Sequence, residues 1–122
     1  MALIKNLHHS DLIIGRNSEA QARSFYCSVL GFSEIPKPED LRKNGGLWLT
    51  LGTLQIHLSV QDGYDPRATK AHLAFEVELL SKVKDLVISQ GLKWSDGSPI
   101  PGFVRGDTRD PFGNRLEFLQ AT

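Results

Sequence analysis

The chain has 122 residues, which is enough for a single domain with a sizeable core. Its 14 basic and 14 acidic residues cancel, which argues against nucleic acid or an anionic membrane surface as a partner. The sequence has no long apolar run, no signal-peptide core in residues 1–6 and a single cysteine, Cys27. We therefore expect a cytoplasmic protein without disulfides or membrane spans.

Residues 3–60 predict a first module of one strand, one helix and three further strands. In chain order we expect a strand over 3–15, a helix from Ser18 to Gly31, a strand over 32–35, a loop through Asn44, and strands over 47–51 and 54–60. In the first strand His9 lies on the face opposite Ile14. In the last strand polar and apolar residues alternate strictly, and His57 lies on the polar face.

A polar linker over 61–70 leads to a second module over 71–121, in which the same order of elements recurs. We expect a strand over 72–77, a helix over about 79–90, strands over 92–94 and 103–108, a turn over 110–114 and a strand over 115–120. His72 begins the first of these strands, and Glu117 lies within the last.

The spacing of matching residues supports a repeat. Gly31 and Gly91 are 91 − 31 = 60 positions apart, and His57 and Glu117 are 117 − 57 = 60 apart. His9 and His72 are 72 − 9 = 63 apart. One such module cannot bury both its helix and its sheet face, so the two copies are expected to pair with their apolar faces under the helices. The opposite faces would then bring His9, His57, His72 and Glu117 to one concave site.

Imidazole and carboxylate groups on strands are suitable ligands for a divalent metal such as zinc, iron, manganese or nickel. Three or four protein ligands would leave open positions for water and substrate, as catalytic metal sites do. Taken singly, each of these residues is more often a hydrogen-bonded strand histidine or a solvated glutamate. Their shared placement favours the metal site, with His57 as a fourth ligand or a pocket base.

Other side chains of the expected sheets have two possible roles each. Trp48 and Phe103 could stack on a bound substrate, or they could be core or dimer contacts. Arg105 and Arg115 could bind an anionic group, although surface exposure is the commoner role for an arginine. Cys27, on the first helix, is expected to be an inert packed thiol.

Two segments resemble a known family. They are residues 24–32, Ser-Phe-Tyr-Cys-Ser-Val-Leu-Gly-Phe, and residues 110–117, Asp-Pro-Phe-Gly-Asn-Arg-Leu-Glu. Together with the doubled module they resemble the vicinal oxygen chelate superfamily, the group of glyoxalases, bleomycin-resistance proteins and extradiol dioxygenases. The resemblance implies an α+β fold of two βαβββ modules that form cupped mixed sheets with helices outside, often completed in a homodimer.

The resemblance also implies roles for particular residues. His9 and His72 match the first-strand metal ligands of the superfamily, and Glu117 matches the final carboxylate ligand, a set similar to that of fosfomycin-resistance enzymes and extradiol dioxygenases. His57 stands where glyoxalase I carries a glutamate, which argues against ordinary glyoxalase I activity.

The leading hypothesis is a glyoxalase-like metalloenzyme that acts on a small substrate with two adjacent oxygens. Lyase, isomerase, transferase and dioxygenase chemistry all remain open, as does whether the site lies within one chain or across two. The alternative is a non-catalytic protein of the bleomycin-resistance kind, which would sequester a ligand without metal and stack it on Trp48 and Phe103.

Overall fold

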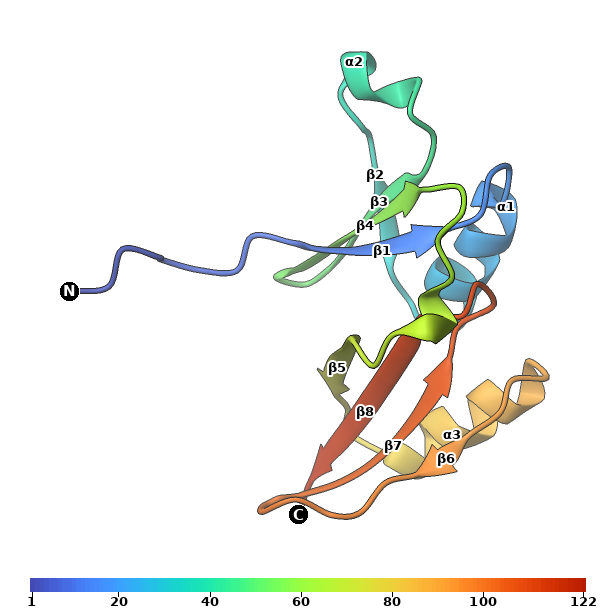
Figure 1. Cartoon of the computed structure of the whole chain (residues 1–122). Helices are drawn as coiled ribbons and strands as arrows, with labels where there is room; N and C mark the ends of the chain where they lie inside the picture. The colour runs from blue at the N-terminus through green and yellow to red at the C-terminus, as the bar shows by residue number, and fades with distance from the viewer. The chain divides into compact units, whose positions relative to one another are not determined.

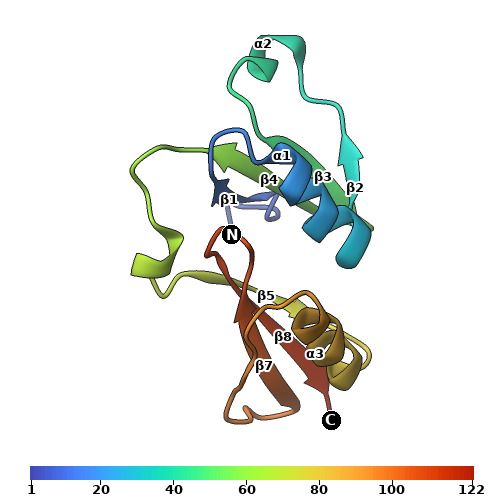
Figure 2. The same ribbon diagram turned by 90° about the vertical axis from the view of Figure 1, so that its right-hand side faces the viewer.

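The computed structural model describes all residues, 1–122, and the chain forms two compact units, Met1–Tyr64 and Asp65–Thr122. Each unit contains one four-stranded sheet of mixed strand direction, with its principal helix packed on one face (Figures 1 and 2). The fold class expected from the sequence, two βαβββ modules of α+β type, is confirmed.

The first unit follows the expected order of strand, helix and three strands. Its elements are β1 (Ser10–Ile14), α1 (Glu19–Ala22), the π-helix η1 (Arg23–Val29), β2 (Ser33–Ile35), α2 (Glu39–Arg42), β3 (Leu47–Leu51) and β4 (Leu54–Val60). The strands lie in the order β1-β4-β3-β2, with β1 parallel to β4 and the other pairs antiparallel. The last strand of the module therefore lies beside the first.

The second unit repeats this topology. Its elements are the 3₁₀ turn η2 (Pro66–Ala68), β5 (His72–Glu76), α3 (Leu80–Ser89), β6 (Ser95–Asp96), β7 (Phe103–Arg109) and β8 (Arg115–Ala121). The strand order is β5-β8-β7-β6, and again the first strand runs parallel to the last. No helix of the chain combines the length and the apolar character that crossing a bilayer would require.

The first strand is shorter than the sequence predicts. β1 begins at Ser10, whereas residues 1–9 are exposed and extend away from the sheet (Figure 1). Ser10 pairs with Ile56, and β4 begins only at Leu54. Most of residues 3–9 consequently have no neighbouring strand with which to form hydrogen bonds. An alternating apolar pattern is not enough to make a strand without such a neighbour.

The first helix also differs from the expected one, because only its first turn is α-helical and the rest is the π-helix η1. Ser18 precedes the helix as expected, but its hydroxyl donates to the carbonyl of Gly15 rather than capping the first turn. The amide of Leu30 donates to Phe25 O at 3.0 Å, the i to i−5 bond of π-helical winding. Gly31 ends the helix with a φ of 90°, as the sequence predicts.

Two further expectations were wrong in detail. The predicted loop through Asn44 contains the short helix α2, whose first turn is acidic and whose last turn holds Arg42, an arrangement that suits the helix dipole. The predicted strand over 92–94 is not a strand, and the edge strand β6 begins at Ser95 instead.

Trp94 explains the shift of β6, because it packs on the sheet rather than pairing at its edge. The Trp94 indole stacks on Phe118 with ring centroids 6.0 Å apart. The indole lies over β7 at Gly106. If residue 106 had a side chain, its Cβ would lie only 2.2 Å from Trp94 Cζ2. The backbone at Lys93 is fixed separately, because Thr108 Oγ1 donates to its carbonyl at 2.6 Å.

Each unit buries the apolar face of its sheet beneath its helix, as the alternation predicts. In the first unit the buried apolar residues are Ile14, Ala22, Phe25, Tyr26, Phe32, Leu47, Leu49, Ile56 and Leu58. In the second they are Val87, Leu116 and Phe118, with Leu73 and Phe75 half-buried beside them. This packing leaves the other face of each sheet free for polar side chains.

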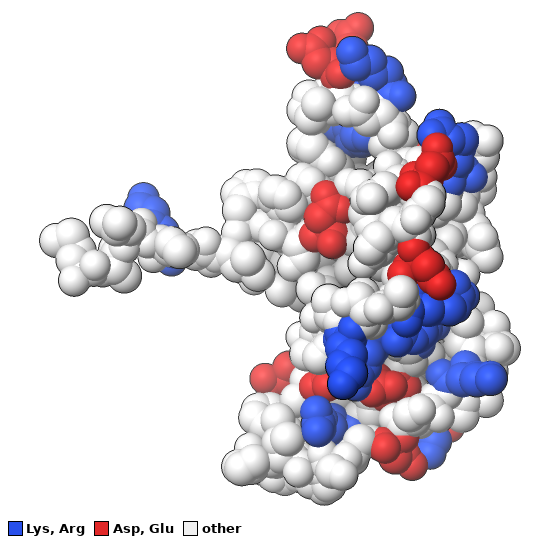
Figure 3. Space-filling view, in the orientation of Figure 1, with Lys and Arg blue, Asp and Glu red and all other residues white.

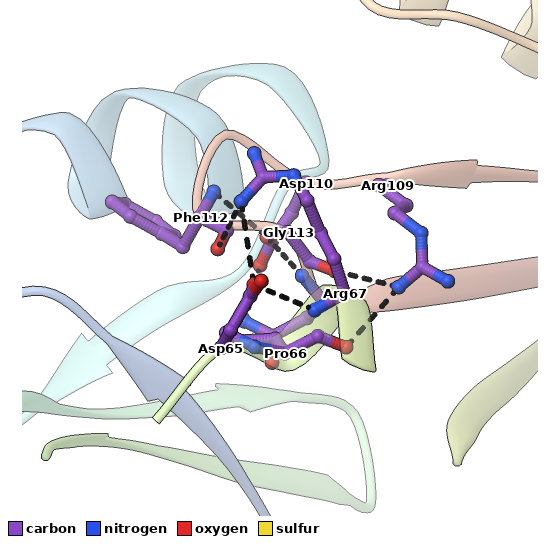
Figure 4. Close-up of polar contacts among 8 residues, drawn as sticks. Asp65, Pro66, Arg67, Arg109, Asp110, Phe112 and Gly113 are labelled. Atoms are coloured by element: carbon purple, nitrogen blue, oxygen red, sulfur yellow. Dashed lines mark hydrogen bonds and ion pairs between the residues drawn. The ribbon is translucent and has the colours of Figure 1, made fainter. Parts of the chain in front are cut away.

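The turn between β7 and β8 is held by the carboxylate of Asp110, which is 2% exposed. The carboxylate accepts from the backbone amides of Phe112 and Asn114 at 2.9 and 2.8 Å. Figure 4 shows Arg109 beside this turn, where Nη1 donates to Pro66 O at 3.2 Å and to Gly113 O at 2.8 Å. The turn thereby anchors η2 to the second sheet.

We expect Gly106→Ala to lower the free energy of unfolding by about 2–3 kcal/mol, because the added methyl overlaps the Trp94 indole. Gly15→Ala is the matched control, since the nearest atom to its Cβ, Ser18 Oγ, is 3.8 Å away. Urea unfolding of both variants measures the difference. Equal stability of the two would show that Trp94 does not rest on β7.

Asp110→Ala is expected to cost about 2–4 kcal/mol, because it leaves buried amide donors of the turn without their acceptor. Asp62→Ala, which removes a carboxylate from an exposed ion pair, should leave the stability essentially unchanged. Thermal and urea unfolding test both. A small effect of Asp110→Ala would mean that the turn is held by its other contacts.

Candidate functional site

The face of the second sheet that lies opposite α3 carries most of its charged side chains. β-strand alternation puts Arg105 and Asp107 of β7 on the same face as Arg115 and Glu117 of β8. His72 of β5 joins them, because it is the register partner of Arg115. The sequence pattern that buries Leu116 and Phe118 under the helix therefore also gathers these five side chains.

The side chains of His72 and Glu117 face one another. His72 Nε2 lies 3.4 Å from Glu117 Oε1, and Glu117 is buried with 7% of its side chain exposed. His72 Nδ1 lies 3.0 Å from the carbonyl oxygen of Lys70. A carbonyl can only accept, so Nδ1 carries the hydrogen of that contact, and Nε2 is the ring nitrogen that faces the carboxylate.

Two electron-pair donors that converge in this way suit a cation. The donor set, one imidazole nitrogen and one carboxylate oxygen, is of the kind that zinc, iron, manganese and nickel accept. The bond from Nδ1 to Lys70 fixes the ring orientation, as a supporting hydrogen bond does for many metal-binding histidines. These two residues therefore fit the divalent metal that the sequence analysis predicts.

Arg105 also contacts the glutamate. Its Nη1 lies 3.2 Å from Glu117 Oε1, and its Nε donates to the carbonyl of Ser98 at 2.8 Å. Nearby, Arg115 Nη2 lies 2.9 Å from Asp107 Oδ2. The sequence analysis proposed a substrate contact for Arg105 and did not identify Asp107. The strict alternation of β7 would have placed Asp107 on this face.

In the first unit the corresponding face carries a stack of three rings. His57 lies between His9, whose ring centroid is 3.9 Å away, and Trp48, whose centroid is 4.2 Å away. The rings are inclined by only 15° and 7° respectively. Trp48 and His57 are register partners on β3 and β4, and His9 lies just before β1, which is parallel to β4.

The stack makes His57 a buried, neutral ring. Burial, and next the neighbouring His9, hold the pKa of His57 below its ordinary value. His57 Nε2 is 2.8 Å from Gln55 Oε1, a contact that the sequence analysis did not foresee. Asp11 lies on the same face and accepts from Ser59 Oγ at 2.8 Å.

The structure thus gathers the predicted residues in two groups. His72, Glu117 and Arg105 meet in the second unit, and His9, His57 and Trp48 meet in the first. Phe103 is two residues before Arg105 on β7, so it lies on the same face of the sheet, and it is half-buried. No three His, Cys, Asp or Glu side chains gather within either unit in a way that could hold a metal. The ligand set of His9, His72 and Glu117 stays a prediction.

The surface charge is mixed in both units. On the face shown in Figure 3, basic and acidic side chains lie beside one another, and the N-terminal extension carries little charge. Exposed ion pairs such as Arg16 with Asp62 and Arg23 with Glu34 are part of this pattern. The distribution agrees with the formal net charge of zero.

Comparison with solved structures shows close relatives of the whole fold. A protein assigned to the glyoxalase family from Bacillus anthracis is 36% identical, with a TM-score of 0.90, over 100% of this chain and 99% of its own. A glyoxalase family protein from Enterococcus faecalis is 24% identical, with a TM-score of 0.75, over 97% of this chain and 99% of its own.

A third similar structure is a point mutant of the fosfomycin resistance protein FosX from Listeria monocytogenes. It is 18% identical, with a TM-score of 0.78, over 98% of this chain and 93% of its own. That protein was solved in complex with Mn(II) and 1S,2S-dihydroxypropylphosphonic acid. At this identity the likeness shows the fold alone.

Among curated proteins no sequence matches the chain. The family model of the Glyoxalase/Bleomycin resistance protein/Dioxygenase superfamily matches residues 7–118, nearly the full length. This match includes both modules and both segments on which the resemblance was based. The chain belongs to the Glyoxalase/Bleomycin resistance protein/Dioxygenase superfamily.

Proposed function

We propose that this protein is a metal-dependent enzyme that acts on a small substrate with two adjacent oxygen atoms. The observation that carries the proposal is the His72–Glu117 pair, with Nε2 and Oε1 3.4 Å apart and the histidine oriented through Nδ1. A superfamily member with this donor pair on paired strands has the start of a catalytic metal site.

His9 would supply a third ligand, from the first unit of the same chain or of a second copy. By register His9 is the counterpart of His72, because Asp11 pairs with His57 as Ala74 pairs with Glu117. His57 would be a fourth ligand or a base. Its Nε2 is bonded to Gln55, so Nδ1 is the nitrogen available for either role.

The FosX complex supports the chemical class. Its ligand, 1S,2S-dihydroxypropylphosphonic acid, carries hydroxyl groups on adjacent carbons, and its metal is Mn(II). A divalent metal bound here would act as a Lewis acid toward such a pair of oxygens. Around it Trp48 and Phe103 would supply apolar walls, and Arg105 would contribute a positive charge.

We also propose that the protein acts in the cytoplasm as a homodimer. The N-terminal extension supports a partner copy, because Met1, Leu3, Ile4 and Leu7 are all exposed apolar side chains in it. Exposed apolar side chains that lie close together are common at protein interfaces.

A second function, sequestration of a ligand without metal or chemistry, is favoured by the stack of Trp48, His57 and His9. Three nearly parallel rings form an apolar, polarisable surface on which a planar ligand could stack. In this function Trp48 and Phe103 would carry the affinity, and His72 and Glu117 would not matter.

Titration with Mn²⁺, followed by calorimetry or electron paramagnetic resonance, tests the metal site. We expect one site per chain in the wild type and a loss of affinity of at least about 100-fold in His72→Ala and in Glu117→Ala, since each removes a ligand. Asp40→Ala removes an exposed carboxylate of α2 outside the predicted ligand set and should bind like the wild type. If the wild type binds neither Mn²⁺, Zn²⁺, Fe²⁺ nor Ni²⁺, the metalloenzyme proposal fails.

Substrate assays distinguish the remaining possibilities. The metal-loaded protein should turn over one member of a panel of methylglyoxal–thiol adducts, fosfomycin and catechols, and Glu117→Ala should abolish that turnover. A metal-free protein that binds a planar ligand, with affinity lost in Trp48→Ala and kept in Glu117→Ala, would establish sequestration instead.

A further inference from the structure

One carboxylate oxygen in the second unit has two competing partners. Glu117 Oε1 lies 3.4 Å from His72 Nε2 and 3.2 Å from Arg105 Nη1. The three side chains come from β5, β7 and β8, and only Glu117 is fully buried. Any cation that binds between His72 and Glu117 must therefore share this oxygen with the guanidinium of Arg105.

The position of Arg105 is fixed by its surroundings. Arg105 Nε donates to the carbonyl of Ser98 at 2.8 Å. The absence of a side chain at Gly97 makes room for it, because a Cβ there would lie 3.1 Å from Arg105 Cγ. The guanidinium is therefore held beside Glu117 by backbone contacts as well as by the ion pair.

Arg105 differs in this respect from Arg115, which lies on the same face. Arg115 is paired with Asp107 at 2.9 Å, so its charge is compensated by a carboxylate that is not a proposed metal ligand. The ion pair of Arg105 is with Glu117 itself. An arginine stays protonated at any physiological pH, so its charge cannot be removed to admit a metal.

Two effects follow from this geometry. The guanidinium neutralises Glu117 and occupies one of its oxygens, which lowers the charge available to a metal. It also repels a divalent ion at short range, in a region where Glu117 is 7% exposed and Arg105 30% exposed, so that solvent screens the repulsion only in part. Both effects weaken metal binding.

We propose that Arg105 is a built-in competitor for the metal at the His72–Glu117 pair and sets the affinity of that site. Without metal its guanidinium is the counterion of Glu117, and metal binding requires Arg105 to release the carboxylate. The inference rests on the proposed function for the identity of the site, but it concerns a residue that the proposed ligand set leaves out.

The test is the dissociation constant for Mn²⁺ of the full-length wild type and of Arg105→Gln, Arg105→Lys and Arg115→Gln. Arg105→Gln should bind Mn²⁺ at least about tenfold more tightly than the wild type, because it loses a close positive charge. Arg105→Lys keeps the charge and should stay within about threefold of the wild type. Arg115→Gln removes an equal charge that does not contact Glu117. Its increase in Mn²⁺ affinity should be several-fold smaller than that of Arg105→Gln.

Thermal unfolding with and without Mn²⁺ supplies a second readout. Arg105→Gln removes the positive charge beside Glu117, so the midpoint temperature of unfolding should be lower than that of the wild type without Mn²⁺. Added Mn²⁺ should raise this midpoint temperature more in Arg105→Gln than in the wild type. Far-ultraviolet circular dichroism confirms that each variant is folded before titration.

The outcomes separate this inference from the proposed function. If the wild type binds Mn²⁺ and Arg105→Gln binds it no more tightly, the inference is overturned and the metalloenzyme proposal stands. If only Arg105→Gln binds Mn²⁺, the inference stands and the natural protein is not a metalloenzyme. If neither binds, both fail. An increase in Arg105→Lys or Arg115→Gln equal to that in Arg105→Gln also overturns the inference.

Discussion

The parallel pairing of the first and last strands is the constraint on which both units depend. In each module the last strand lies inside the sheet, between the first strand and the third, so side chains of the first strand meet those of a hairpin that is distant in sequence. In the second unit this pairing sets His72 beside Glu117. In the first it sets β1 beside β4 and brings His9 onto His57. Without this pairing the histidines would be isolated strand residues.

The two polar faces satisfy their side chains in different ways. The face of the second unit is ionic, and Arg105 and Arg115 each have a carboxylate partner there. The face of the first unit is aromatic, and its one buried histidine is kept neutral by burial and by another imidazole. The two sheets therefore share one topology but differ in the chemistry of their polar faces.

The sequence predicted the sheets well, because strand alternation and the closing glycines are local signals. It could not predict Trp94, whose position depends on the gap above Gly106, a tertiary feature. It placed His9 within a strand, although β1 begins only at Ser10, and residues 3–7 lie beyond the end of β4. Of the candidate site, the facing of His72 and Glu117 followed from alternation and repeat spacing. The contact between Arg105 and Glu117 could not be predicted in this way, because no sequence pattern shows which side chain of one strand will contact a side chain of the next.

The two modules differ in length within the segment that contains the π-helix η1. Asp11 pairs with His57 as Ala74 pairs with Glu117, so the sheets keep the same register although the first-strand residues are offset by 74 − 11 = 63 positions and the last-strand residues by 117 − 57 = 60. Gly31 and Gly91 already show the smaller offset, which places three deleted or inserted residues between the first strand and the end of the helix. The wider winding of η1 lies in that interval. The difference in length between the two modules therefore lies in the strand–helix loop and the helix, and the first and last strands of both sheets keep the same alignment.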